Sequence, residues 1–277
     1  MIKEKTKWKE LSISNNFVFT RIMLNEDICK EFIETLLDIK VNKIDKLEIE
    51  KTVGRLYESK SIRLDLYLKA DDNVIDLEMQ VASELDLAKR SRYYQSVIDT
   101  NNLSKGKFYE SLSESIIIFI CLYDPFKKNE PIYYFENKEK TLNIKLNDGT
   151  TKIFFNTTAY DKIDNLKIRS LLHYINSGKC AGKFIEKLDK EVKCIKRDER
   201  LKGEYMFYNA EIMRMQYEGI KIGEKKGIEI GEKNYQSEII HELYNSGQSI
   251  NYIMKITKLT KSEVEEILNK NPSRDYI

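Results

Sequence analysis

Two alternating runs joined by a short turn, IRLDLYLKADDNVIDLEMQ at 62–80, constrain the fold of this chain more than any other segment. Alternation of apolar and polar residues is typical of paired strands, and the ADDN tetrapeptide between the runs is typical of a hairpin turn. We therefore expect antiparallel strands over 61–69 and 74–80. Asp65 lies on the more polar face of the first strand, and Glu78 on the more polar face of the second.

The two acids are suited to metal chemistry if the strands pair. Carboxylates from neighbouring strands can converge on one cation, and Mg²⁺ takes one or two carboxylates while it keeps several waters. Such an ion can activate a water and stabilise a phosphate oxygen. Gln80 returns to the face of Glu78, with Val74 and Asp76, and there it could orient that water or touch the phosphate. Acids on the solvent side of a hairpin are also common, so a purely structural role stays open.

The order of the other elements predicts an α/β core with a mixed sheet. Helical spacing of apolar residues covers 14–38 and 85–103, and most of the chain beyond 161. The run SIIIFICLYD (115–124) is typical of a buried central strand. Further strands are expected at 43–51 and, between 132 and 156, in IYYFE, TLNIKL and KIFFN.

A basic and aromatic helix follows the hairpin, in the segment KRSRYYQ (89–95). Guanidinium groups bind phosphate with two parallel hydrogen bonds, and tyrosines stack or donate hydrogen bonds. Arg90, Arg92 and Tyr94 are therefore candidates for contact with a nucleic-acid backbone. A solvated helix face with core tyrosines is the alternative.

The composition of the chain argues against several kinds of site and partner but does not identify a function. The net charge of +2 does not point to a polyanionic partner, so any anion site must come from local clustering. The four cysteines form no CxxC pair, which disfavours zinc, and the two histidines have no acid at a useful spacing. We find no N-terminal apolar leader and no apolar run of membrane-spanning length, and we expect a cytoplasmic protein that does not enter the membrane.

Several segments, in order and spacing, resemble one known family. They are SNNFVF, IRLDLYLKADDNVIDLEMQ, KRSRYYQ, LSKGKFYESLSESIIIFIC and YYFEN. Together they look like the Rpn family of recombination-promoting nucleases and transposases, within the PD-(D/E)XK nuclease superfamily. The resemblance covers about residues 8–200 and extends to the glycine-rich tail.

The resemblance implies a restriction-endonuclease-like mixed sheet flanked by helices, with a helical C-terminal tail. It also implies metal-dependent DNA cleavage linked to recombination, mobile elements or defence against foreign DNA. Asp65 and Glu78 match the motif acids, which would hold Mg²⁺, with Mn²⁺ or Ca²⁺ as alternatives. Gln80 stands where the wider superfamily usually has lysine, and Asn16 where relatives often carry aspartate. Arg63 is a further accessory candidate.

Another early acid could replace the charge that Asn16 lacks. Glu31 and Glu34, on the first predicted helix, are the candidates.

The C-terminal tail has a different sequence pattern from the rest of the chain. Glycine recurs every four residues at 219, 223, 227 and 231, which favours either a connector or a self-associating helix. Short helices with the rhythm of a helix-turn-helix follow, and their glutamates favour an assembly element over a DNA reader. We predict a nuclease-like domain at 1–200, a helical glycine-repeat connector at 201–235 and a small helical module at 236–277.

Three functions are consistent with the sequence. The first is a Mg²⁺-dependent DNA endonuclease that forms homo-oligomers through its C-terminal helical region. The second is a catalytically weak or inactive DNA-binding or assembly protein that keeps the nuclease fold, and Asn16 and Gln80 motivate it. The third is a protein-interaction module that acts through the tail.

Overall fold

The computed structural model describes residues 8–53, 62–83 and 86–269. The helices are α1 (Asn16–Met23), α2 (Glu26–Leu37), α3 (Leu87–Asn102), α4 (Leu166–Ser177), α5 (Lys183–Arg197), α6 (Glu199–Asn245), α7 (Ile250–Thr257) and α8 (Lys261–Asn269). Short 3₁₀ turns lie at Trp8–Glu10, Tyr109–Ser111 and Thr157–Lys162. The strands are β1 (Ile44–Val53), β2 (Ile62–Ala70), β3 (Asn73–Gln80), β4 (Ser115–Cys121), β5 (Ile132–Phe135) and β6 (Thr150–Asn156).

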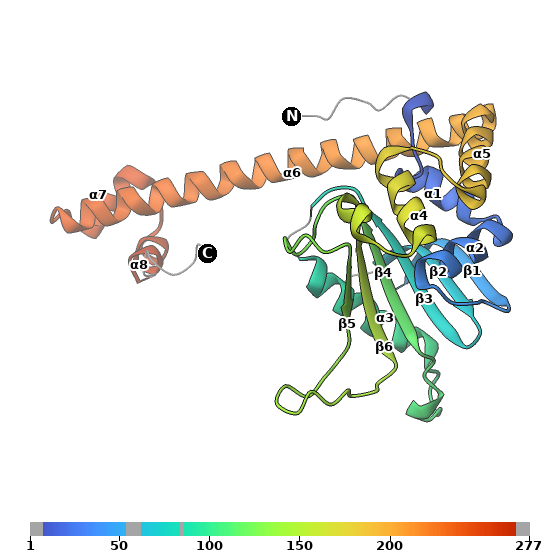
Figure 1. Cartoon of the computed structure of the whole chain (residues 1–277). Helices are drawn as coiled ribbons and strands as arrows, with labels where there is room; N and C mark the ends of the chain where they lie inside the picture. Colours follow the sequence, from blue (N-terminus) through green and yellow to red (C-terminus); the bar gives the residue numbers. More distant parts are fainter. Residues whose placement is uncertain (1–7, 54–61, 84–85, 270–277) are drawn as a thin grey trace. The chain divides into compact units, whose positions relative to one another are not determined.

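Within the described residues, six strands form one mixed sheet in the order β1-β2-β3-β4-β6-β5 (Figure 1). The first three strands are antiparallel neighbours. β4 runs parallel to β3, β6 runs parallel to β4, and β5 closes the far edge antiparallel to β6. The predicted mixed sheet flanked by helices, with a helical C-terminal region, is confirmed.

Each face of the sheet has its own apolar core. On one face, residues of α1, α2, α4 and α5 pack against alternate residues of the central strands, such as Leu77 and Ile118. On the other face, α3 packs over Phe119 and Phe154. Helices on both sides explain why the central strand β4 is almost wholly apolar.

The four free cysteines divide between these cores and the surface. Cys29 is buried in the first core and Cys121 in the second, as expected for core thiols. Cys180 and Cys194 are exposed.

The predicted hairpin is confirmed with its register. Asp71 and Asp72 both have positive φ values, 47° and 67°, which is the backbone of a two-residue hairpin loop. Ala70 pairs with Asn73, and the ladder continues to Leu66 opposite Leu77.

The predicted helix over 14–38 is wrong in one respect, because it divides into α1 and α2. The Asn25 side chain accepts a hydrogen bond from the N–H of Ile28 and begins the second helix. Asn15 caps α1 in the same way. Short polar side chains compete with the helical backbone for these N–H groups, and a 3.6-residue periodicity does not register that competition.

The predicted strand in TLNIKL is also wrong. Residues 141–146 form a loop with one isolated bridge, between Lys138 and Lys145. The alternating residues Leu142, Ile144 and Leu146 are all more than half exposed. Alternation alone does not make a strand when no neighbouring strand is present to pair with it.

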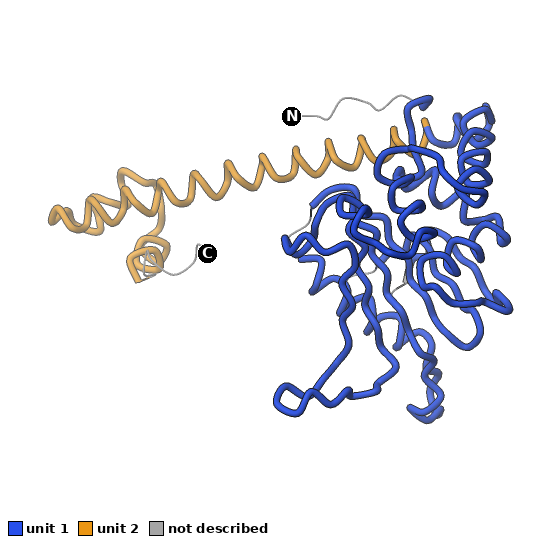
Figure 2. Tube along the Cα trace, in the orientation of Figure 1, with its two compact units in different colours: residues 1–205 blue, residues 206–277 orange. Residues whose placement is uncertain are grey.

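The chain divides into two compact units, residues 1–205 and 206–277 (Figure 2). In the second unit the end of α6 packs with α7 and α8 around Ile240, Ile253 and Val264. The glycine repeat lies inside α6, which is helical throughout it. Ser61 and Leu85, where a predicted strand and helix begin, lie outside the described residues, as do the predicted domain ends at 1–7 and 270–277.

Across the three described ranges, no helix combines the length and the apolar content that crossing a bilayer requires.

Candidate active site

Asp65 and Glu78 interlock where the β2–β3 ladder stops. A Glu78 carboxylate oxygen, Oε1, accepts a hydrogen bond of 2.9 Å from the backbone N–H of Asp65. The Asp65 oxygen Oδ2 accepts one of 3.1 Å from the N–H of Met79. Each carboxylate therefore takes the place of a backbone carbonyl, and this holds both side chains in fixed positions. The structure therefore places the two carboxylates beside each other on neighbouring strands.

In β2, the alternation of side chains between the two faces of the sheet reverses at Asp65. Leu66 and Leu68 pack in the core under α1 and α2, whereas Ile62 and Leu64 pack in the core under α3. Strict alternation would place all four on one face, so the facing reverses at Asp65. Beside it in β1, Glu50 has a φ of 49°, which marks a local irregularity. Asp65 lies at this departure from ideal pleating and is only 7% exposed.

Arg90 connects α3 to the acids. Its guanidinium donates to Glu78 Oε2 at 2.9 Å and to Gln80 Oε1 at 3.2 Å. Its Nε donates to the Tyr94 hydroxyl at 2.9 Å, one helical turn further on. Arg90 and Tyr94 stand four residues apart and so share one face of α3, and Arg90 joins this face to Glu78 and Gln80.

Asn16 reaches the same cluster from the first turn of α1. Its Nδ2 donates to Asp65 Oδ1 at 2.7 Å, while its Oδ1 is buried with no hydrogen-bond partner among the described residues. The amide therefore gives Asp65 a donor, where an aspartate would have placed a second carboxylate.

Asp76 is a third acid that the sequence reasoning did not assign. It is completely buried on the same face of β3 as Glu78, and neither carboxylate oxygen has a hydrogen-bond partner within the described part of the chain. The signal was present, since alternation already placed Asp76, Glu78 and Gln80 together. Polarity alone did not show that this face is buried beneath α3.

Burial raises the pKa of all three acids, and the charge of neighbouring carboxylates raises it further for Glu78 and Asp76. Burial, and next the charge of Asp65, raise the pKa of Glu78 to about 8. Burial, then the charges of Glu78 and Asp65, place the pKa of Asp76 well above its ordinary value. Burial raises the pKa of Asp65 as well, although the Met79 N–H and the Asn16 amide oppose it.

The donor set fits a hard divalent cation. Three buried acids face the guanidinium of Arg90, so the ionised cluster carries excess negative charge that a cation would offset. Two carboxylates are also the usual protein share of a Mg²⁺ site, since this ion keeps several waters. No group of three or more His, Cys, Asp or Glu side chains in the described residues is arranged to hold a metal by itself.

Other predicted residues lie apart from this hydrogen-bonded cluster. Arg63 pairs with Glu50, and its charge lowers the pKa of Asp65. Arg92 is exposed on α3. Glu31 pairs with Lys187 at 3.1 Å, and Glu34 accepts from the N–H of Val41.

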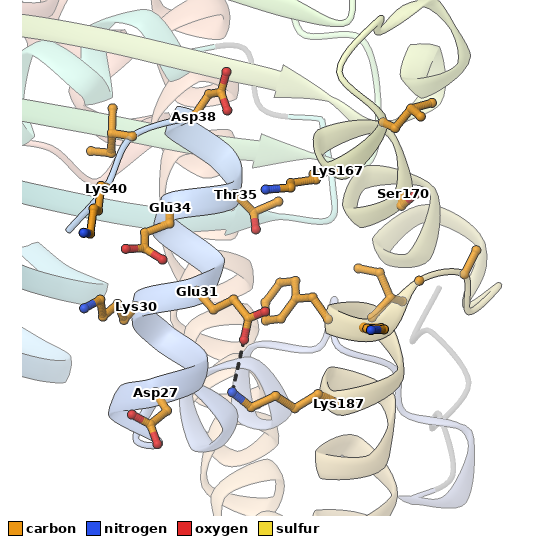
Figure 3. Close-up of a pocket in the computed structure, with 17 residues that line it drawn as sticks. Asp27, Lys30, Glu31, Glu34, Thr35, Asp38, Lys40, Lys167, Ser170 and Lys187 are labelled. Carbon is orange, nitrogen blue, oxygen red and sulfur yellow. Dashed lines mark hydrogen bonds and ion pairs between the residues drawn. The ribbon is translucent and has the colours of Figure 1, made fainter. Parts of the chain in front are cut away.

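Glu31 and Glu34 instead line a groove of about 910 Å³ between α2, α4 and α5 (Figure 3). Both lysines and acids line this groove, and Asp65 is not among its residues.

One comparison with known proteins identifies a family. A family model described as "PD-(D/E)XK nuclease family transposase" matches residues 14–245, which include α1, the whole sheet and the glycine repeat. Neither the curated proteins nor the solved structures contain a match to this chain.

Proposed function

Because the chain belongs to the PD-(D/E)XK nuclease family transposases, we propose that it is a Mg²⁺-dependent endonuclease that hydrolyses phosphodiester bonds of DNA. The observation that carries the proposal is the interlocked pair Asp65 and Glu78, with Arg90 against it. Asp65 and Glu78 would hold the ion, with Mn²⁺ or Ca²⁺ as alternatives. When bound, such an ion supplies a polarised water and charge stabilisation at the phosphate.

Arg90 replaces the charge that Gln80 lacks. The superfamily usually has lysine at the position of Gln80, and an amide carries no positive charge. The guanidinium of Arg90 lies 3.2 Å from Gln80 Oε1, so α3 brings a cation to the same place. There it can hold a phosphate oxygen, while Gln80 orients the attacking water. Tyr94 is 7% exposed and accepts from Arg90, so we give it a positioning role.

Arg92 stays a candidate for contact with the DNA backbone, since it is exposed on the same helix. Such contacts are sensitive to salt and insensitive to base sequence.

A plasmid-nicking assay tests the proposal. Wild-type protein, Asp65→Ala and Glu78→Ala would be compared in Mg²⁺, Mn²⁺, Ca²⁺ and EDTA. We expect nicking by the wild type in Mg²⁺, none in EDTA, and a loss of at least 100-fold in both variants, as for removal of a principal stabilising group. Unchanged cleavage by folded Asp65→Ala would falsify the assignment.

A DNA-binding protein without cleavage is the second candidate. The Asn16 amide donates to Asp65 and so occupies the acid with a hydrogen bond. This candidate predicts salt-sensitive DNA binding without any metal-dependent product.

We also propose that the chain forms homo-oligomers through its C-terminal helical region. Many large apolar side chains on α6 are exposed, among them Phe207, Met215, Tyr217, Ile220 and Ile228. Exposed apolar surface of this kind is typical of contact sites.

A further inference from the structure

A small aromatic pocket lies beside α3, separate from the acid cluster. Its volume is about 230 Å³, and Phe126, Phe135 and Phe154 form its apolar wall. The rings pack at angles to one another, with centroids 5.0 to 5.6 Å apart. Phe154 is buried, but 44% of Phe135 is exposed, so one aromatic surface is open to a ligand.

Polar groups stand around this apolar wall. Hydrogen-bond donors and acceptors come from Ser91 of α3, from Lys152 of β6, and from Glu136 and Asn137, which follow β5. Aromatic surface with a few polar groups at its edge suits a planar heterocycle, which stacks by its face and hydrogen-bonds by its rim.

The pocket lies level with the acids across the sheet. Glu78 pairs with Phe119 on the next strand, and Phe119 pairs with Phe154 on the strand after that. The two phenylalanine rings stack, with centroids 5.2 Å apart. Two strand spacings separate Glu78 from Phe154, or about 10 Å. That distance is comparable to the reach of one or two nucleotides along a strand.

The first turn of α3 lies between the two sites. Arg90 faces the acids from this turn, while Ala88 and Ser91 line the pocket. The turn contains no acid, and it carries Lys89 as well as Arg90. A phosphodiester backbone that crosses this turn would meet positive charge and helix N–H groups, with the acids on one side and the pocket on the other.

We propose that this pocket binds one unstacked base of the DNA strand, a nucleotide or two away from the bond that is cut. The inference rests on the proposed function and adds a substrate class to it, DNA that is single-stranded or locally unpaired. A base in the pocket would fix the register of the strand over Asp65 and Glu78.

Oligonucleotide binding in EDTA, where no cleavage is expected, tests the pocket. Single-stranded oligonucleotides with one abasic site, moved stepwise along the sequence, would be titrated into wild type, Phe135→Ala and the control Phe108→Ala. Phe108 is an aromatic residue, 80% exposed, that does not line the pocket. A 2-aminopurine at the sensitive position would report unstacking by its fluorescence.

We expect one abasic position to weaken wild-type binding about tenfold, in line with loss of one stacked base. Phe135→Ala should bind the intact strand about tenfold more weakly and show no further loss at that position, because the base has lost its partner. Phe108→Ala should behave like the wild type.

The outcomes separate this inference from the proposed function. Suppose that the wild type nicks plasmid in Mg²⁺ while no abasic position and no Phe135 substitution changes binding. In that case the base-binding proposal for the pocket is wrong, and the proposed nuclease function is unaffected. If Phe135→Ala still loses about tenfold in binding at the abasic position to which the wild type is sensitive, the pocket is also overturned. A wild type that neither nicks nor binds DNA overturns both.

Discussion

Arg90 faces a cluster that would repel itself without it. Its charge lowers the pKa of Asp65, Asp76 and Glu78, against the burial that raises all three. Its side chain is only 22% exposed where it pairs with Glu78. An arginine so placed is as important to the fold as to any phosphate that enters the site.

Replacing Arg90 should therefore cost stability. We expect Arg90→Ala to lower the free energy of unfolding by about 2 kcal/mol at pH 7, the order seen when hydrogen bonds to charged groups are lost. Urea unfolding measures this. Arg92→Ala is the matched control and should lie within about 0.5 kcal/mol of the wild type, as an exposed residue does. Equal effects from both substitutions would contradict the role given to Arg90.

Asn16 allows a test of metal binding that does not depend on activity. In Asn16→Asp a carboxylate replaces the amide that donates to Asp65, so the protein in EDTA should melt several degrees lower. The same variant should gain more thermal stability from Mg²⁺ than the wild type gains, because the ion then meets three acids. Asn16→Ala controls for the lost hydrogen bond. A Mg²⁺ response no larger than that of the wild type would count against a cation at this place.

At the scale of elements, the two faces of strand β3 have different roles. Its odd-numbered residues Ile75, Leu77 and Met79 complete the core under α1, α2, α4 and α5. Its even-numbered residues Asp76, Glu78 and Gln80 are polar and yet buried under α3. The first set stabilises the domain, and the second reduces that stability whenever it ionises.

Stability should therefore depend on pH in a definite direction. The folded-state pKa of Glu78, about 8, exceeds its usual 4.5, so its contribution is full below pH 4.5 and is lost as the pH rises through 8. We expect urea unfolding in EDTA to show lower stability at pH 9 than at pH 6, by at most about 1.4 kcal/mol per pH unit for each such group.

Asp76 should share in this effect. Asp76→Asn removes one buried titration, so it should stabilise the protein at pH 9 and flatten the pH dependence. The control is Asp72→Asn, on the exposed hairpin turn, which should leave the slope unchanged. A slope that Asp76→Asn does not reduce would show that Asp76 is not involved.

At the scale of the whole molecule, the chain joins a two-cored α/β unit to a second unit built from helices. Residue 206 begins the second unit, yet α6 continues without a break from Glu199 to Asn245. Each of its repeat glycines has open space where a Cβ would lie. The glycines are therefore not required by packing within the described chain.

That observation gives a test of oligomerisation. Gly223→Ala with Gly227→Ala should make the helix more stable by about 1 kcal/mol per site, if nothing approaches them. If α6 pairs closely with a second copy at these glycines, the added methyl groups should weaken the assembly instead. Sedimentation velocity over a range of concentrations measures this, with Lys221→Ala as a control on the same helix. We expect the double variant to dissociate at higher concentration than the wild type does.

Sequence patterns predicted the features that depend on interactions between residues close together in the chain. The ADDN turn and the alternation around it were sufficient to place Asp65 opposite Glu78, because register follows from the turn. Arg90 and Tyr94, both named as candidates from the sequence, are four residues apart and meet on one face of α3. The burial of Asp76 could not be predicted, since it depends on α3 covering a polar strand face. The strand predicted at 141–146 does not form for a related reason, because a strand needs a neighbouring strand to pair with. The sequence of the segment itself does not specify that neighbouring strand.

The two buried cysteines allow the opening of each apolar core to be measured separately. Cys29 lies in one core and Cys121 in the other, and burial raises the pKa of each thiol to about 12. Neither should react with a thiol reagent until its own layer opens, because the thiolate is the reactive form. With Cys180 and Cys194 replaced by serine, the two labelling rates would give the opening kinetics of each layer separately. The protein thus carries one native reporter on each side of its sheet, and the slower one identifies the core that opens less readily.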